Sequence, residues 1–138
     1  MTQEDKELLL KDLCARLPYG IKCRYQHIQY IENGKIIDIN MFGRVNVDGH
    51  VKDICDVKPY LFPLSSMTEE QKEELKNEIS KQTDILIERM KNDDCGIDCG
   101  KYHFHSLLEL EWLLKNHFDY RGLIPKGAAI DATGLNIY

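Results

Sequence analysis

The hydrophobic positions at the start of the chain recur with the spacing of a helix. Its apolar stripe consists of Leu9, Leu10, Leu13 and Leu17. Thr2, with Asp5 three residues further on, is a capping pair that favours a helix start. The stripe ends at Pro18 and Gly20, because neither residue readily continues a helix. The sequence therefore predicts an N-terminal helix from Thr2 to about Leu17.

From Ile21 onward the pattern changes to an alternation with a period of two. Ile21, Cys23 and Tyr25 alternate with polar residues, as in a half-buried strand. Asn33-Gly34 then precedes a second alternating run, and this pair is a strong hairpin signal because both turn residues need a positive φ. Asp48-Gly49 marks a further hairpin. We therefore predict an antiparallel four-stranded meander over approximately residues 21–55.

Residues 59–63 read Pro-Tyr-Leu-Phe-Pro. Two prolines remove two hydrogen-bond donors from a strand, so the pattern excludes a central strand here. We expect an apolar crossover laid against the sheet instead.

The second half of the chain carries two further helical patterns. Ser66 or Thr68 caps a long helix that runs to about Asn92. After a loop at residues 93–100, Ser106 with Glu109 makes another capping box, and the third helix runs to about Asn116.

The tail is irregular and closes with a short strand at residues 135–138. The order of elements predicts the α+β class, in a single domain of residues 1–138. The N-terminal helix and the two C-terminal helices are expected to pack on the meander.

Composition narrows the function classes. The net charge is -5 with a pI of about 5.5, and no stretch concentrates lysine and arginine, so nucleic-acid binding is disfavoured. No segment approaches the run of about 18 apolar residues that spans a bilayer, which predicts no membrane partner. The polar, acidic start is unlike a signal peptide, and the five cysteines suit free thiols in a reducing compartment. We expect a cytoplasmic location.

One short segment carries candidate metal ligands. Cys95, Cys99, His103 and His105 lie within eleven residues, beside two glycines, and zinc takes four such ligands in a tetrahedron. The Cys-x3-Cys-x3-His-x-His spacing is not a common structural-zinc pattern. A surface loop with incidental cysteines, or a catalytic Cys–His pair, are the alternatives. The sequence predicts no other cofactor.

A second cluster follows the third helix. His117, Tyr120 and Arg121 are residue types that serve well on the rim of a binding surface. In the structural alternative, Phe118 and Leu123 fill the core while Asp119 pairs with Arg121.

Two stretches carry a resemblance to a known group. Residues 59–70, PYLFPLSSMTEE, and the tail from His117 to Gly127 resemble a family of small uncharacterised proteins from gut-bacterial genomes and their phages or other mobile elements. The resemblance covers most of the chain from Leu17 onward. It implies kinship but no activity.

These observations lead to one main hypothesis and two alternatives. The main hypothesis is a small non-enzymatic binding or accessory protein of phage or mobile-element origin, with a protein partner or a second copy as its ligand. The alternatives are a zinc-binding protein or Cys/His enzyme centred on residues 95–105, and a nucleic-acid-associated phage protein.

Overall fold

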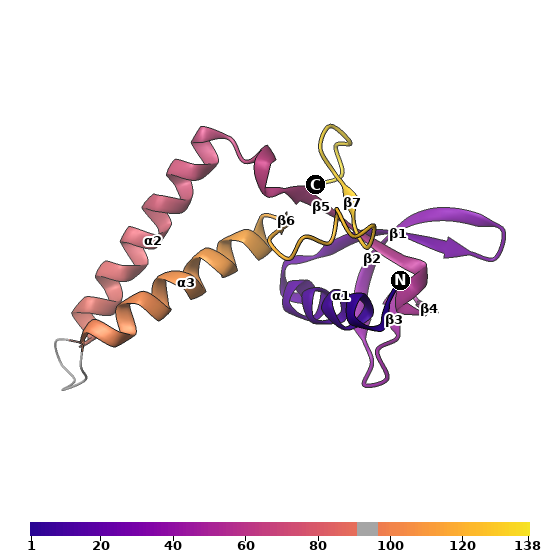
Figure 1. Cartoon of the computed structure of the whole chain (residues 1–138), viewed down its shortest axis with the longest axis horizontal. Helices are drawn as coiled ribbons and strands as arrows, with labels where there is room; N and C mark the ends of the chain where they lie inside the picture. The colour runs from indigo at the N-terminus through magenta and orange to yellow at the C-terminus, as the bar shows by residue number, and fades with distance from the viewer. Residues whose placement is uncertain (91–96) are drawn as a thin grey trace. The chain divides into compact units, whose positions relative to one another are not determined.

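A computed structural model describes residues 1–90 and 97–138 of the chain (Figure 1). It divides into two compact units, one formed by residues 1–66 with 117–138 and the other by residues 67–116. The α+β class is confirmed. That the chain folds as one domain stays a prediction.

The first unit holds an N-terminal helix, short 3-10 turns and one mixed sheet. Its elements are α1 (Gln3–Arg16), β1 (Ile21–His27), β2 (Tyr30–Ile39), β3 (Val45–Val47), β4 (His50–Lys52), β5 (Val57–Pro63), β6 (Phe118–Asp119) and β7 (Ile130–Asp131). The strand order is β4-β3-β2-β1-β5-β6, and β7 also pairs with β5. β1 to β4 pair antiparallel, as the meander predicts. β5 pairs antiparallel with β1, and β6 and β7 run parallel to β5. The sheet therefore has more strands than predicted and is mixed.

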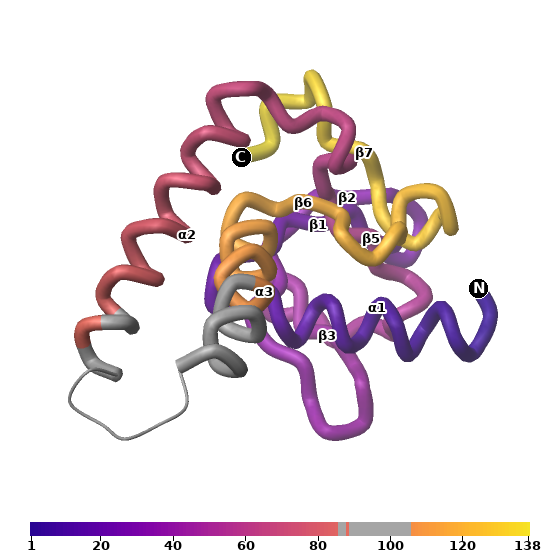
Figure 2. Tube along the Cα trace, turned by 60° about the vertical axis from the view of Figure 1, so that its left-hand side comes forward, coloured from indigo at the N-terminus to yellow at the C-terminus, as the bar shows by residue number. Residues whose placement is uncertain are grey.

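Helix α1 begins as its sequence predicts. The Thr2 hydroxyl accepts a hydrogen bond from the backbone N–H of Asp5 at 3.1 Å, and the Asp5 carboxylate accepts one from the N–H of Thr2 at 3.3 Å. Leu9 and Leu13 are fully buried and join the core of the sheet. Figure 2 shows the helix beside β3, along one side of the strands.

The first hairpin does not turn where we predicted. Asn33 and Gly34 lie inside β2, opposite Arg24 and Cys23, and the turn falls after His27. Burial sets this register, because Ile21, which is fully buried, then faces Ile36, which is 2% exposed. The local turn signal of Asn-Gly is thus overridden by the pairing of core residues.

Gly34 has a different role. A Cβ at this position would lie 2.6 Å from Asp48 Oδ2, 2.6 Å from Val47 Cγ1 and 3.0 Å from Tyr25 Cε1. The glycine therefore lets the β3–β4 hairpin approach β2 closely. That second hairpin turns at Asp48 and Gly49, which have φ values of 48° and 91°, so its prediction is confirmed.

The prediction that residues 59–63 cannot form a central strand is wrong. They belong to β5, which lies between β1 and β6. The prolines are tolerated because Pro59 is the last residue paired with β1, and Pro63 is the last paired with β6. Each proline thus lies at the end of a ladder.

The tail also differs from its prediction. Residues 135–138 form no strand. Instead, the Tyr138 hydroxyl donates to the carbonyl of Tyr60 at 2.9 Å and accepts from the N–H of Lys22 at 3.1 Å. A side chain therefore fastens the tail to the sheet.

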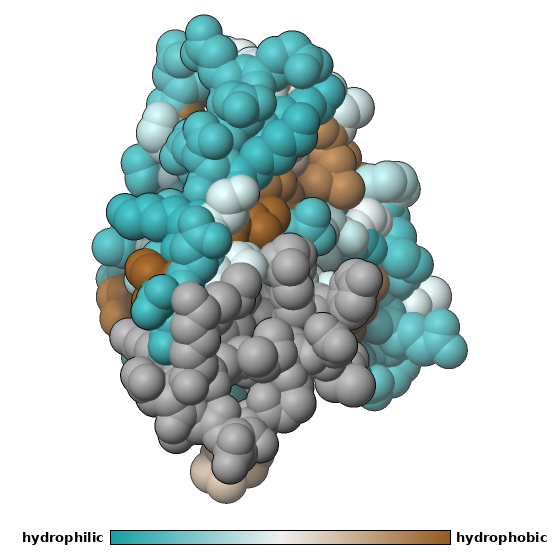
Figure 3. Space-filling view, turned by 90° about the vertical axis from the view of Figure 1, so that its left-hand side faces the viewer, coloured by the Kyte–Doolittle hydropathy of each residue, from teal (hydrophilic) through white to brown (hydrophobic). Residues whose placement is uncertain are grey.

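The second unit is a pair of helices, α2 (Glu69–Met90) and α3 (Ile97–Lys115), that pack against each other. Thr68 provides the predicted capping box, since its hydroxyl accepts from Gln71 N–H at 3.2 Å and its own N–H donates to Gln71 Oε1 at 2.9 Å. Outside the residues drawn in grey, the side of the molecule shown in Figure 3 is largely hydrophilic. Neither helix, over its described residues, is long and apolar enough to cross a membrane.

The third helix begins earlier than predicted. The pattern of Ser106 and Glu109 lies inside α3, which starts at Ile97. Both residue types are tolerated within a helix, so the motif does not by itself mark a helix start.

Candidate functional site

The predicted zinc ligands lie in the least described part of the chain. Cys95 is outside the described residues. Cys99, His103 and His105 belong to the backbone of helix α3, where we expected a loop, and their side chains are outside the description too. The zinc site therefore stays a prediction.

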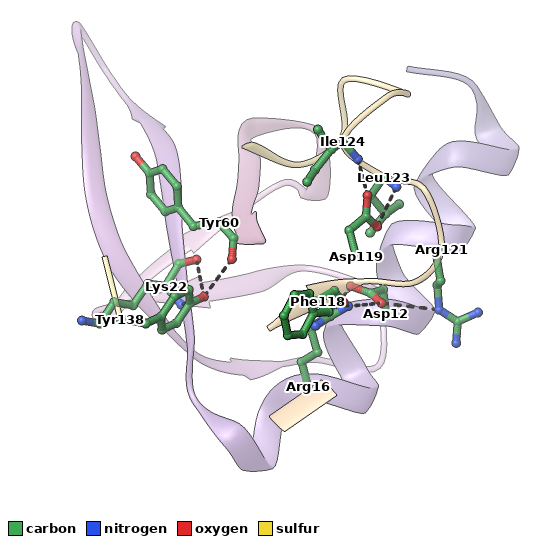
Figure 4. Close-up of polar contacts among 10 residues, drawn as sticks. All are labelled: Asp12, Arg16, Lys22, Tyr60, Phe118, Asp119, Arg121, Leu123, Ile124 and Tyr138. Atoms are coloured by element: carbon green, nitrogen blue, oxygen red, sulfur yellow. Dashed lines mark hydrogen bonds and ion pairs between the residues drawn. The ribbon is translucent and has the colours of Figure 1, made fainter. Parts of the chain in front are cut away.

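The second predicted cluster is tied to a buried ion pair. Arg16 and Asp12, one turn apart on α1, are both fully buried and joined through Arg16 Nε and Asp12 Oδ2 at 2.6 Å. Arg16 Nη2 also donates to the carbonyl of Phe118 at 2.6 Å (Figure 4). The pair therefore connects α1 to β6.

Arg121 extends this network, because its Nε lies 3.5 Å from Asp12 Oδ1. Its guanidinium carbon lies 4.6 Å from the centre of the Tyr120 ring, a cation–π distance. Burial raises the pKa of the Tyr120 hydroxyl. Two guanidinium groups thus share one buried carboxylate.

The expected pairing of Asp119 with Arg121 is wrong. Asp119 is buried, and its two carboxylate oxygens accept hydrogen bonds from the backbone N–H groups of Leu123 and Ile124, both at 2.8 Å (Figure 4). An aspartate commonly stabilises a turn in this way. The expectation that Phe118 and Leu123 fill the core is confirmed, since they are 1% and 0% exposed.

His117 is partly buried against the end of the chain. Its ring stacks on Tyr138 with centroids 3.6 Å apart and planes 11° apart, and its backbone carbonyl accepts from Phe62 N–H at 2.8 Å. Burial, together with the nearby charges of Arg16 and Lys22, lowers the pKa of His117 to about 4. The imidazole is therefore neutral at pH 7.

This depressed pKa predicts a pH dependence of stability. Below its ordinary pKa of 6.5, His117 binds a proton in the unfolded chain but not in the folded protein until about pH 4. The free energy of unfolding should therefore fall as pH drops from about 6.5 to 4, by at most about 1.4 kcal/mol per pH unit from this group. Urea denaturation at several pH values should show a shallower dependence for His117→Gln. An equal dependence in both proteins would mean that the imidazole titrates normally when folded.

Most of the contacts in this cluster thus hold the fold together. His117, Tyr120 and Arg121 lie near the buried pair of α1, each partly buried. Arg121 keeps 27% of its side chain exposed. Their role as a binding surface stays a prediction.

A different surface has unpaired backbone groups, the outer edge of β2. Lys35 directs its N–H to Asp48 Oδ2 and its carbonyl to Asp48 N–H, both at 3.1 Å, away from β1. Backbone groups of an antiparallel strand point alternately to its two sides, so those of Ile31 and Asn33 point to this same side. β3 pairs with β2 only over Ile36–Ile39, and no other strand among residues 1–90 and 97–138 pairs with this edge.

The tip of the same hairpin is apolar. Ile28, Tyr30 and Ile31 are 85%, 62% and 63% exposed. Figure 1 shows the end of the β1–β2 hairpin projecting to the right of the labels β1 and β2. Natural proteins usually protect free edges with charges, prolines or bulges. An open edge beside three exposed apolar side chains is therefore a candidate interaction surface. We call residues 28–33 the hairpin edge.

A second apolar spot lacks this combination. Met41 and Phe42 are 90% and 81% exposed in the β2–β3 connection. Their backbone is closed into a turn, in which Asn40 N–H donates to the Arg44 carbonyl and the Asn40 side chain accepts from Phe42 N–H. The spot therefore offers apolar side chains without a strand edge.

The sequence did not reveal the hairpin edge. The turn occurs at Ile28, whose φ is 29°, and a β-branched residue with positive φ is uncommon. Because we predicted the turn at Asn33-Gly34, we assigned the apolar residues at positions 28, 30 and 31 to the strand before it. The free edge could have been predicted only if the pairing of β1 with β2, and with it the position of the turn, had been known.

Comparison of the chain with family models, with curated proteins and with solved structures finds no match.

Proposed function

We propose that this protein is a non-enzymatic binding or accessory module that binds a β-strand of a partner protein at the hairpin edge. The observation that carries the proposal is the coincidence of two features: backbone groups at Ile31 and Asn33 that no strand of the described residues pairs, and exposed apolar side chains at the tip. Strand addition uses both, since backbone hydrogen bonds supply affinity and alternate side chains supply specificity.

The charge distribution around the edge favours a protein ligand. Glu32 accepts a hydrogen bond from the Tyr25 hydroxyl at 2.8 Å, and the chain as a whole is acidic. Residues 28–33 contain no lysine or arginine to neutralise phosphates, which disfavours nucleic acid. The resemblance of residues 59–70 and 117–127 to small proteins of phages and mobile elements supports an accessory role in the cytoplasm.

Site-specific photo-cross-linking tests the proposal in living cells. A photoreactive phenylalanine analogue replaces Ile28 in one variant and Lys11, an exposed residue of α1, in a matched control. We expect a discrete cross-linked product with another protein from position 28 and none from position 11.

Two results would contradict the proposal. If position 28 gives no product, or the same products as position 11, the hairpin edge is not the contact surface. If the only product has twice the mass of the chain, the ligand is a second copy and not a separate protein.

A further inference from the structure

Two histidines far apart in the sequence lie side by side in the first unit. His27 ends β1 and His50 begins β4. Their ring centroids are 4.9 Å apart, with the planes tilted by 51°. Both rings also lie near Tyr25, at 6.3 Å and 6.5 Å between centroids.

The separation of the two rings is short enough for one shared metal ion. Zinc–nitrogen bonds of about 2.0–2.1 Å at tetrahedral angles place the centroids of two imidazoles roughly 5 Å apart. The observed separation of 4.9 Å is close to that value.

His27 also has an unsatisfied ring nitrogen. Its Nδ1 atom is buried and has no hydrogen-bond partner among the residues that the structure describes. A buried polar atom without a partner costs free energy. A metal ion bound to Nδ1 would give this atom a partner and remove that cost.

We propose that His27 and His50 bind one zinc ion. Neutral imidazole is a preferred ligand of zinc and of its neighbours copper and nickel, whereas magnesium prefers oxygen. No group of three or more His, Cys, Asp or Glu residues is placed to hold a metal within the described part of the chain. Water therefore completes the coordination, and the site is weaker than a four-ligand structural site.

The charged groups around the rings are balanced. The Lys52 ammonium lies 5.4 Å from the centre of the Tyr25 ring, and the Glu32 carboxylate accepts a hydrogen bond from the Tyr25 hydroxyl at 2.8 Å. The approach of a cation is thus not opposed by an isolated positive charge. Since His27 pairs with Tyr30 at the tip of the hairpin, a bound metal would link that tip to β4.

This zinc site is independent of the one predicted near residue 99, so the experiment removes that one first. The test protein is the full chain carrying Cys95→Ser, Cys99→Ser, His103→Gln and His105→Gln. A calorimetric titration with zinc alone should show one zinc ion bound per chain. The same titration with magnesium should show no binding. His27→Gln and His50→Gln should each weaken zinc binding by more than about tenfold. His117→Gln is the matched control and should leave it unchanged.

Spectroscopy with cobalt separates the two kinds of site. Cobalt bound at His27 and His50 in the test protein should lack the thiolate charge-transfer band that cysteine ligation produces, whereas cobalt bound near residue 99 in the wild-type chain would show it. Circular dichroism must show that His50→Gln keeps its fold, which its exposed position favours. Absence of zinc binding in the test protein, or binding that survives His27→Gln and His50→Gln unchanged, would overturn the proposal.

Discussion

Replacing Asp12 with alanine should lower the free energy of unfolding by roughly 3–5 kcal/mol, because Arg16 would then be a buried charge without its partner. Both side chains are fully buried, and Arg16 also donates to the backbone of β6. The loss should appear as a lower midpoint of guanidinium denaturation, monitored by circular dichroism. Lys11→Ala, an exposed change on the same helix, should alter stability by no more than about 0.5 kcal/mol.

A paired variant identifies the cause. Combining Asp12→Ala with Arg16→Met removes both buried charges, and replacing a buried ion pair by apolar side chains is often close to neutral. The paired variant should therefore be more stable than Asp12→Ala alone. If it is less stable, the uncompensated guanidinium is not what destabilises the single variant.

Gly34→Ala should cost about 1–3 kcal/mol, the usual range for overpacking a core. The new methyl group would lie 2.6 Å from Val47 Cγ1 and 2.6 Å from Asp48 Oδ2. Val47 is fully buried and stiff at χ1, while moving Asp48 would weaken its bond to the Lys35 N–H. Thermal unfolding of the variant, compared with the parent, measures the cost.

The specific contact can be isolated with a second substitution. Val47→Ala leaves a cavity beside Gly34 and is itself destabilising. If the clash explains the effect, the variant with both changes should lose less stability than the sum of the two single losses. Additive losses would show that Gly34→Ala acts through something other than this contact.

The elements that the sequence predicts well are those with local causes. The cap at Thr2, the cap at Thr68 and the Asp48-Gly49 turn depend on side chains and φ angles within a few residues. Each is seen in the structure at its expected position.

The errors come from contacts between distant residues. Asn33-Gly34 carries the stronger turn signal, yet the facing of Ile21 with Ile36 sets the register, and Gly34 serves a close approach by β3. Residues 59–63 can form a strand because the pairing with β1 ends at Pro59 and the pairing with β6 ends at Pro63. Neither cause is visible in a local pattern.

The candidate sites show the same limit. Arg121 stands out by composition, but its involvement with Asp12, about a hundred residues earlier in the chain, requires the fold. The hairpin edge depends on a turn at Ile28 that no residue preference marks. The pairing of His27 with His50 depends on how the sheet brings β4 back to the end of β1.

Amide hydrogen exchange at the edge of β2 tests the central claim most directly. In the free protein, the N–H groups of Ile31 and Asn33 should exchange rapidly, because they point away from β1 and no strand of the described part of the chain pairs with them. In the complex with the partner recovered through position 28, the account predicts that these two amides become protected. If other surfaces gain protection while Ile31 and Asn33 exchange as fast as before, strand addition at the hairpin edge is wrong.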